Sequence, residues 1–306
     1  MWLGAHLGIA GGLADAVREA RKIGAESLQI FSKSPQMWSG PPIAPAAAEE
    51  FRAAVVAEGL RATAVHHAYL ANLASPKAFM LKRSRAAFLD EVRRADLLGA
   101  DALIFHPGAH LGSGVETGLR TIAESLRFIL AERPESRVRI LLENAAGQGT
   151  TIGSKLEELA SVLAQVDRPD RLGVTLDTCH LFAAGFDFRD EAGYGRLVDQ
   201  VDRVLGAGTV RAFHLNDAKE ALGSHLDRHE NIGKGQIGTE GFRHFVNDPR
   251  WDATPGYLET PLDDREHYAR YAEDLATLRS LRTGASNPAP ARKPARRAAS
   301  RPTTPK

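Results

Sequence analysis

The chain has 306 residues, of which 43% are apolar and 25% charged, and these fractions are typical of a soluble globular protein. No window approaches the roughly 20 apolar residues that a membrane-spanning helix needs, and the N-terminus lacks the basic and apolar regions of a signal peptide. The single cysteine, Cys179, excludes an internal disulfide. We therefore expect a cytoplasmic protein, acting as a monomer.

Eight short apolar segments alternate with eight segments of helical periodicity. The predicted strands are Trp2–His6, Ser27–Phe31, Arg61–His66, Ala102–His106, Val138–Glu143, Leu172–Asp177, Val210–Leu215 and Gly256–Thr260. The predicted helices are Leu13–Ile23, Ala46–Glu58, Ala78–Leu98, Glu116–Ala131, Lys155–Gln165, Arg189–Leu205, Thr239–Asn247 and Arg265–Leu281. Several of these helices are bounded by glycine or proline, as helix ends commonly are.

This alternation predicts parallel strands joined by right-handed crossovers. Eight such units favour an α/β fold, a closed (β/α)8 TIM barrel over residues 1–282, which normally needs about 250 residues. An open doubly wound sheet is the alternative, but it would gather its ligands at one switch point. We favour the barrel because polar residues end nearly every strand, around a ring.

The C-terminal segment, residues 283–306, is rich in Pro, Ala, Ser and Arg and has no apolar periodicity, so it is predicted to be disordered. Its six basic residues have no acidic counterpart, which leaves 33 basic and 38 acidic residues in the body. An acidic body suits a polyanion poorly unless its carboxylates bind cations.

Metal-ligand residue types stand at the last or next-to-last position of six predicted strands, on the face where a barrel carries its active site. These residues are His66, His106, Glu143, Asp177, His214 and Glu259. His180 follows Asp177 by three residues, and Asp227 and His229 share one side of an extended segment because side chains alternate. Five histidines and four carboxylates exceed the about four ligands of one zinc ion, so two or three ions are predicted.

Each of these residues alone has an ordinary explanation, as a hydrogen-bonded histidine at the rim or as half of an ion pair. Their convergence does not, because clustered buried carboxylates repel one another unless a metal or a base neutralises them. Cys179 is expected to be a buried core thiol rather than a ligand. His6, His67 and His110 also lie near strand ends, either as contacts to the ligands or substrate or in structural roles.

Seven stretches of the chain, in this order, resemble the endonuclease IV (deoxyribonuclease IV) family of apurinic/apyrimidinic endonucleases. They are GAHLGIAGGL at 4–13, HHAYLANL at 66–73, FHPGAHLG at 105–112, LLENAAGQGT at 141–150, DTCHLFAAGFD at 177–187, FHLNDAKEALGSHLDRHENIGKGQIG at 213–238 and YLETP at 257–261. The resemblance spans about residues 1–280, and motifs of this length in this order are highly specific.

The resemblance implies a site of three zinc ions, with manganese at some positions. One ion would be bound by His66, His106 and Glu143, and a third by His180, Asp227 and His229. Glu143 would bridge to a second ion, which Asp177, His214 and Glu259 would also hold. The implied reaction is DNA base-excision repair, in which zinc-activated hydroxide hydrolyses the phosphodiester 5′ to an abasic site, leaving a 3′-hydroxyl and a 5′-deoxyribose phosphate.

The resemblance further implies trimming of blocked 3′ ends and two catalytic carboxylates. Glu143 would orient the cluster, and Glu259 would assist proton transfer. Duplex DNA would be recognised by residues that enter the gap at the lesion and by basic residues that contact phosphates. The first set is Gln36, Met37, Trp38, Tyr69 and Leu70, and the second is Lys33, Lys219, Arg228 and Lys234. Gln36 departs from the family, which often has arginine at this position. The basic tail is expected either to add DNA affinity or to be a solvated extension.

Two other functions remain open. A sugar isomerase or epimerase shares the barrel and binds one or two divalent metals, but it has no need of a third. A DNA-binding protein without enzymatic activity has no use for clustered carboxylates beside a polyanion. The ligand count and the Asp227-Arg228-His229 element favour the nuclease over both.

Overall fold

The computed structural model describes residues 1–263 and 268–283, and it confirms the predicted TIM barrel. Eight parallel strands close in the order β1-β10-β7-β6-β5-β4-β3-β2. The strands are β1 (Trp2–Leu7), β2 (Ser27–Ile30), β3 (Ala62–His66), β4 (Ala102–Phe105), β5 (Arg139–Glu143), β6 (Leu172–Asp177), β7 (Val210–His214) and β10 (Pro255–Leu258). Nearly all of the predicted disordered tail, residues 284–306, lies outside the described residues.

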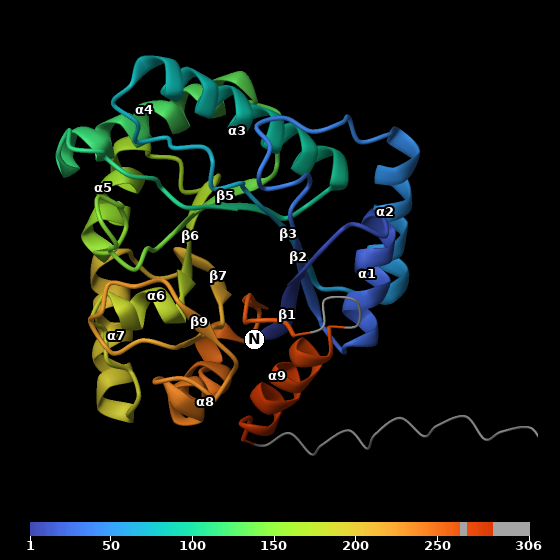
Figure 1. The fold of residues 1–306 in the computed structure, drawn as a ribbon, viewed down its shortest axis with the longest axis vertical. Helices are drawn as coiled ribbons and strands as arrows, with labels where there is room; N and C mark the ends of the chain where they lie inside the picture. The colour runs from blue at the N-terminus through green and yellow to red at the C-terminus, as the bar shows by residue number, and fades with distance from the viewer. Residues whose placement is uncertain (264–267, 284–306) are drawn as a thin grey trace, which may run out of the picture.

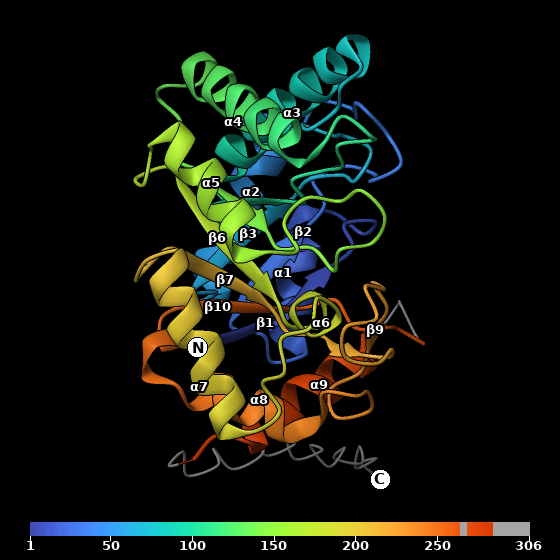
Figure 2. The same cartoon turned by 90° about the vertical axis from the view of Figure 1, so that its left-hand side faces the viewer.

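Helices surround the barrel, as Figures 1 and 2 show from two directions. Eight of them follow the predicted segments: α1 (Leu13–Lys22), α2 (Pro45–Glu58), α3 (Ala78–Leu98), α4 (Val115–Glu132), α5 (Leu156–Val166), α7 (Glu191–Val204), α8 (Gly238–Asn247) and α9 (Ala269–Ser280). Four short elements were not predicted: α6 (Thr178–Ala183), the paired strands β8 (Asp217–Ala218) and β9 (His229–Glu230), and the 3-10 helix η1 (Pro249–Trp251).

The hydrophobic residues form two cores, one inside the barrel and one between the barrel and its helices. The inner core is small, and it consists of Ala64, Ala102, Ile104, Leu141, Ala212 and Tyr257. The outer core takes the opposite faces of the strands and the inward faces of the helices. Because both faces of each strand are buried, the strands are continuous apolar runs, and this pattern made them visible in the sequence.

Glycine sets two features of this architecture. α2 and α3 end at Gly59 and Gly99, whose φ angles of 67° and 66° are left-handed and favour glycine. Gly4 lets β1 approach β2, because a Cβ there would lie 2.0 Å from the carbonyl oxygen of Ser27.

Among the described residues, no helix is both long and apolar enough to cross a bilayer.

Candidate metal centre

All eight barrel strands are parallel, so their carboxyl ends meet at one mouth of the barrel. Four predicted ligands are the last residues of strands: His66 (β3), Glu143 (β5), Asp177 (β6) and His214 (β7). His106 and Glu259 directly follow β4 and β10. His180 lies on α6, Asp227 precedes β9 and His229 opens it. The structure thus brings all nine predicted residues to the same mouth.

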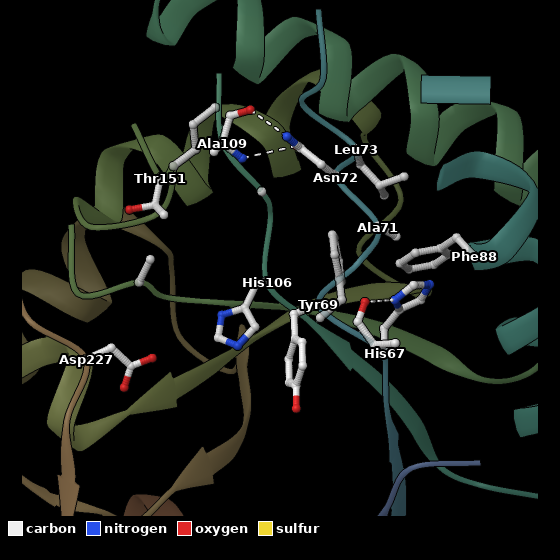
Figure 3. Close-up of a pocket in the computed structure, with 15 residues that line it drawn as sticks. His67, Tyr69, Ala71, Asn72, Leu73, Phe88, His106, Ala109, Thr151 and Asp227 are labelled. Atoms are coloured by element: carbon white, nitrogen blue, oxygen red, sulfur yellow. Dashed lines mark hydrogen bonds between the residues drawn. The ribbon is translucent and has the colours of Figure 1, made fainter. Parts of the chain in front are cut away.

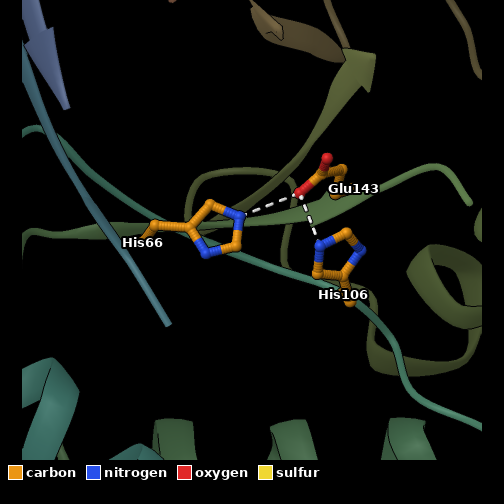
Figure 4. A group of neighbouring side chains, drawn as sticks. All are labelled: His66, His106 and Glu143. Atoms are coloured by element: carbon orange, nitrogen blue, oxygen red, sulfur yellow. Dashed lines mark hydrogen bonds and ion pairs between the residues drawn. The ribbon is translucent and has the colours of Figure 1, made fainter. Parts of the chain in front are cut away.

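Within this mouth, the first group of side chains is His66, His106 and Glu143, whose nearest ligand atoms lie within 4.8 Å of one another (Figure 4). Nε2 of His66 and Nε2 of His106 are 3.0 and 3.6 Å from Oε2 of Glu143. His66 and Glu143 are buried, whereas the side chain of His106 is 34% exposed. The group is therefore open to solvent on the His106 side.

Glu143 also belongs to a second group, with Asp177, His214 and Glu259. Nδ1 of His214 lies 2.9 Å from Oε1 of Glu143, 3.5 Å from Oε2 of Glu259 and 3.8 Å from Oδ2 of Asp177. The two oxygens of Glu143 therefore face different groups. This geometry allows one carboxylate to bridge two cations.

The third group is His180, Asp227 and His229. Oδ2 of Asp227 is 3.2 Å from Nε2 of His180, and Oδ1 is 3.1 Å from Nε2 of His229. Both Nε2 atoms are buried, and neither makes a hydrogen bond of ordinary geometry within the described part of the chain. Two buried imidazole nitrogens without such a bond, beside a carboxylate, are a suitable donor set for a divalent ion.

Four of the five histidines are anchored by a hydrogen bond at one of the two ring nitrogens. These bonds join His66 Nδ1 to the carbonyl of His67 (2.9 Å), His180 Nδ1 to the carbonyl of Asn144 (2.9 Å), His229 Nδ1 to the carbonyl of Glu259 (3.1 Å) and His214 Nε2 to the side-chain oxygen of Gln29 (2.9 Å). A carbonyl oxygen only accepts, so the anchored nitrogen carries a proton and the opposite nitrogen faces the cluster.

The histidines and the carboxylates shift one another's pKa values. Burial alone would raise the pKa of Glu143, but His106 and His214 outweigh it and hold this pKa well below its ordinary value. Burial alone would lower the pKa values of His214 and His229, yet the neighbouring carboxylates raise both to about 9. Divalent cations that bind such ligands take the place of their protons.

The cysteine beside the third group is placed as predicted. Cys179 is fully buried, and its Sγ lies 3.5 Å from the carbonyl oxygen of Arg228. Its sulfur lies near ligand atoms of Asp177 and His229, but burial raises the pKa of this thiol. A protonated thiol is a poor metal ligand.

The other histidines near strand ends have different surroundings. Nδ1 of His6 is 2.8 Å from Oε1 of Glu259, so His6 contacts a predicted ligand. His67 is buried against Phe88, with ring centroids 4.7 Å apart. The ring of His110 accepts hydrogen bonds from two backbone amides of its own loop. His67 and His110 thus have structural contacts.

Three polar residues that support the cluster were missed in the sequence: Gln29, Asn144 and Asn216. Asn216 donates to Oδ2 of Asp177 (2.7 Å), while Asn144 accepts from the Asp177 backbone amide (2.6 Å). All three are at most 2% exposed. The sequence signal that could have identified them is their position inside or just after a buried strand, because a buried polar side chain needs hydrogen-bond partners.

Two cavities flank the cluster and meet at Tyr69, which lines both. One, of about 390 Å³, has His106 and Asp227 on one side and His67 and Phe88 on the other (Figure 3). The second, of about 550 Å³, is lined by His6, Glu259 and aromatic residues. Tyr69 itself is 64% exposed.

The predicted DNA-contacting residues lie mostly on the surface around this mouth. Gln36, Met37, Tyr69, Lys219, Arg228 and Lys234 are exposed, and Trp38 and Leu70 are half-buried. The ring of Trp38 lies under the guanidinium of Arg83, whose Cζ is 4.2 Å from the ring centroid.

Lys33 is an exception, and its predicted role as a phosphate contact must be corrected. Its side chain is only 3% exposed, and its ammonium group forms a buried ion pair with Glu91. A phosphate contact would require this pair to break and would leave the buried Glu91 carboxylate without a cation, with only the hydroxyl of Ser32 as a hydrogen-bond partner. Lys33 instead helps to hold the loop after β2 against α3.

Comparison with protein families and curated proteins gives consistent results. A family model described as "Xylose isomerase-like TIM barrel" matches residues 17–281. A protein of Chloroflexus aurantiacus named "Probable endonuclease 4" is 43% identical over 282 residues, which cover 92% of this chain and 98% of the relative. A protein of the same name from Citrifermentans bemidjiense is 42% identical over 281 residues, again covering 92% and 98%.

Solved structures are also more similar to this chain when they are endonucleases than when they are sugar epimerases. The crystal structure of endonuclease IV from Thermus thermophilus aligns with a TM-score of 0.81 and 36% identity, covering 92% of this chain and 98% of that one. A D-psicose 3-epimerase aligns over 92% and 98% with a TM-score of 0.67 but only 13% identity. The likeness to the epimerase extends to the fold alone.

Proposed function

The chain belongs to the endonuclease IV family, and we propose that it is a base-excision repair nuclease acting on duplex DNA. Its reaction would be hydrolysis of the phosphodiester 5′ to an abasic site, leaving a 3′-hydroxyl and a 5′-deoxyribose phosphate. It would also trim blocked 3′ ends. The observation that carries this proposal is the convergence of nine metal-ligand side chains into overlapping groups at one mouth of the barrel, of which the three described above include all nine.

The donor set fits divalent ions of the zinc type. Four histidines have one ring nitrogen anchored to the protein and the other directed into the cluster, which is the usual arrangement of metal-binding histidines. Three ions would occupy the three groups, as zinc or with manganese at some positions. His66, His106 and Glu143 would hold the first, and His180, Asp227 and His229 the third. Glu143 would be shared with the second, together with Asp177, His214 and Glu259.

When bound, such ions lower the pKa of water and stabilise negative charge on phosphate oxygens. Glu143 lies beside histidines of all three groups, so its role would be to fix the spacing between them. Glu259 is 20% exposed and borders a cavity, and its carboxylate would move a proton at the scissile phosphate. These two carboxylates would be the catalytic residues.

Recognition of the lesion would depend on the exposed loops around the mouth. Tyr69 and Leu70 after β3, with Gln36, Met37 and Trp38 after β2, would enter the gap that the missing base leaves. An abasic nucleotide has no base to unstack, so extruding its sugar costs less than at an intact pair. Lys219, Arg228 and Lys234 are exposed and would contact phosphates, which position the duplex without reading its sequence.

The alternative functions explain less of the site. A sugar epimerase of this fold would need at most two ions and would leave the group of His180, Asp227 and His229 without a role. A DNA-binding protein without enzymatic activity would gain nothing from four clustered carboxylates beside phosphates. The nuclease alone accounts for all three groups.

The decisive experiment uses a labelled duplex that contains a tetrahydrofuran abasic mimic, with protein as purified, after chelation, and after zinc is restored. We expect a cut 5′ to the lesion that chelation abolishes and zinc restores, and about three zinc ions per chain. An intact duplex together with isomerisation of a free ketose would establish the epimerase instead. Metal content of one ion or none would contradict the trinuclear site.

A further inference from the structure

Gln29 lies inside the barrel on β2 and is fully buried. Its side-chain amide contacts three residues of the mouth: His6 in β1, His214 at the end of β7 and Glu259 directly after β10. Nε2 lies 2.6 Å from Oε1 of Glu259 and 2.9 Å from Nδ1 of His6, and Oε1 lies 2.9 Å from Nε2 of His214. One amide therefore connects residues at the first and last strands of the barrel to His214.

The contact with Glu259 fixes which way this amide points. A carboxylate oxygen only accepts, so the amide must present its NH₂ group to Glu259. Its carbonyl oxygen then faces His214, and that oxygen also only accepts. Nε2 of His214 must therefore carry a proton, and Nδ1 faces the carboxylates of Glu143, Asp177 and Glu259.

Gln29 differs from the anchors of the other three histidines. His66, His180 and His229 are held by backbone carbonyls, which no substitution removes. His214 is held by a side chain, and the same side chain also holds Glu259. His214 and Glu259 belong to one group, so a single substitution would release two of its four members.

We propose that Gln29 is a positioning residue that fixes the tautomer of His214 and the orientation of Glu259, and thereby sets the cation affinity of the group formed by Glu143, Asp177, His214 and Glu259. This inference rests on the metal centre of the proposed function. Removing a partner that orients a ligand typically lowers metal affinity about 10- to 100-fold. The effect should fall on one ion, because the anchors of the other two groups do not involve Gln29.

Gln29→Met tests this with little change in side-chain length. The matched control is Gln165→Met, at an exposed glutamine whose side chain donates to Ser161 of its own helix, far from the mouth. Zinc would be titrated into ion-free protein against a chromophoric chelator. We expect the wild type and Gln165→Met to bind three equivalents alike, whereas Gln29→Met binds two tightly and one about 10- to 100-fold more weakly. With DNA, kcat should fall at limiting zinc while KM stays unchanged.

Two results would overturn the inference. One is wild-type affinity for all three ions in Gln29→Met. The other is equal weakening of all three, which a general loosening of the fold would produce. If the wild type itself binds no zinc and cuts no DNA, the proposed function fails instead.

A second measurement needs no variant of Gln29. Ring nitrogen NMR shifts of His214 in the zinc-loaded wild type, assigned with His214→Asn, report which nitrogen carries the proton. We expect the proton on Nε2. A proton on Nδ1 would reject the role of Gln29.

Discussion

Arg94 on α3 donates a hydrogen bond of 2.9 Å to the carbonyl oxygen of Gly40, in the loop that follows β2. The same guanidinium group reaches the carbonyls of Pro41 (2.7 Å) and Ser32 (3.4 Å), so it holds both ends of the loop segment that presents Gln36 and Met37. The proposed contacts of Gln36 and Met37 with damaged DNA would require fixed positions, and Arg94 on α3 would supply that rigidity.

Arg94→Ala should release this loop while leaving the metal centre intact. Three backbone carbonyls would lose a charged donor, so we expect a KM for abasic duplex about 10-fold higher, an unchanged zinc content and unfolding easier by about 2 kcal/mol. Arg93→Ala, at the exposed neighbouring position, is the matched control. A wild-type KM in Arg94→Ala would mean that the loop does not contact DNA.

Tyr69 should contribute to binding of damaged DNA rather than to the chemical step. The residue is 64% exposed, and its ring makes an edge contact with Phe31 at 6.0 Å between centroids. Because stacking of an aromatic ring on a base contributes about 1–3 kcal/mol, Tyr69→Ala should raise KM about 10- to 100-fold with little effect on kcat. Phe128→Ala, a truncation of an exposed aromatic residue on α4, should behave as wild type in the same steady-state assay.

Glu259→Gln should separate proton transfer from folding. The amide keeps the size of the side chain but cannot carry a proton between water and phosphate, so cleavage should fall about 100-fold or more. Circular dichroism should be unchanged, and single-turnover rates on the tetrahydrofuran duplex give the loss. Cleavage at the wild-type rate would remove Glu259 from the mechanism.

Chelation should lower thermal stability as well as activity. Four carboxylates meet at this mouth, and bound ions stabilise only the folded state. At a free zinc concentration about 100 times the dissociation constant, the stabilisation is about 2.7 kcal/mol for each site. Thermal denaturation with and without chelator should show a fall in the midpoint that zinc reverses. An unchanged midpoint would argue against ions as part of the native fold.

Asp248 should govern part of the acid sensitivity of the fold, far from the metal centre. Burial alone would raise the pKa of Asp248, but hydrogen bonds from Arg250 and Tyr194 outweigh it and hold this pKa below the ordinary 3.8. Because the pKa of Asp248 is lower in the folded chain than in the unfolded chain, its charge stabilises the fold at pH values above the unfolded-state pKa. This stabilisation is lost as the pH falls through the folded-state pKa.

Asp248→Asn should therefore cost about 2 kcal/mol at pH 7, and its difference from wild type should shrink below about pH 4. Urea unfolding across this pH range measures the difference. A difference in unfolding free energy between the wild type and Asp248→Asn that stays constant with pH would show that the charge of Asp248 contributes nothing to stability.

The barrel and the nine clustered residues were predictable because each is indicated by a short pattern of neighbouring residues in the sequence. Strands buried on both faces are apolar runs, and a predicted ligand such as Glu143 stands at the end of its own run. The short elements α6, β8 and β9 were missed because each has too few residues to show a period. Gln29 and Lys33 were missed or misassigned because their partners lie far along the chain: Glu259 is 230 residues from Gln29, and Glu91 is 58 residues from Lys33.

The pairing of β1 with β10 closes the barrel and brings His6 to Glu259. Until the last strand docks against the first, the second group of ligands lacks a member. A chain that ends before β10 therefore lacks one of the nine clustered residues, and the proposed nuclease would stay inactive during synthesis until this strand has been made and has docked.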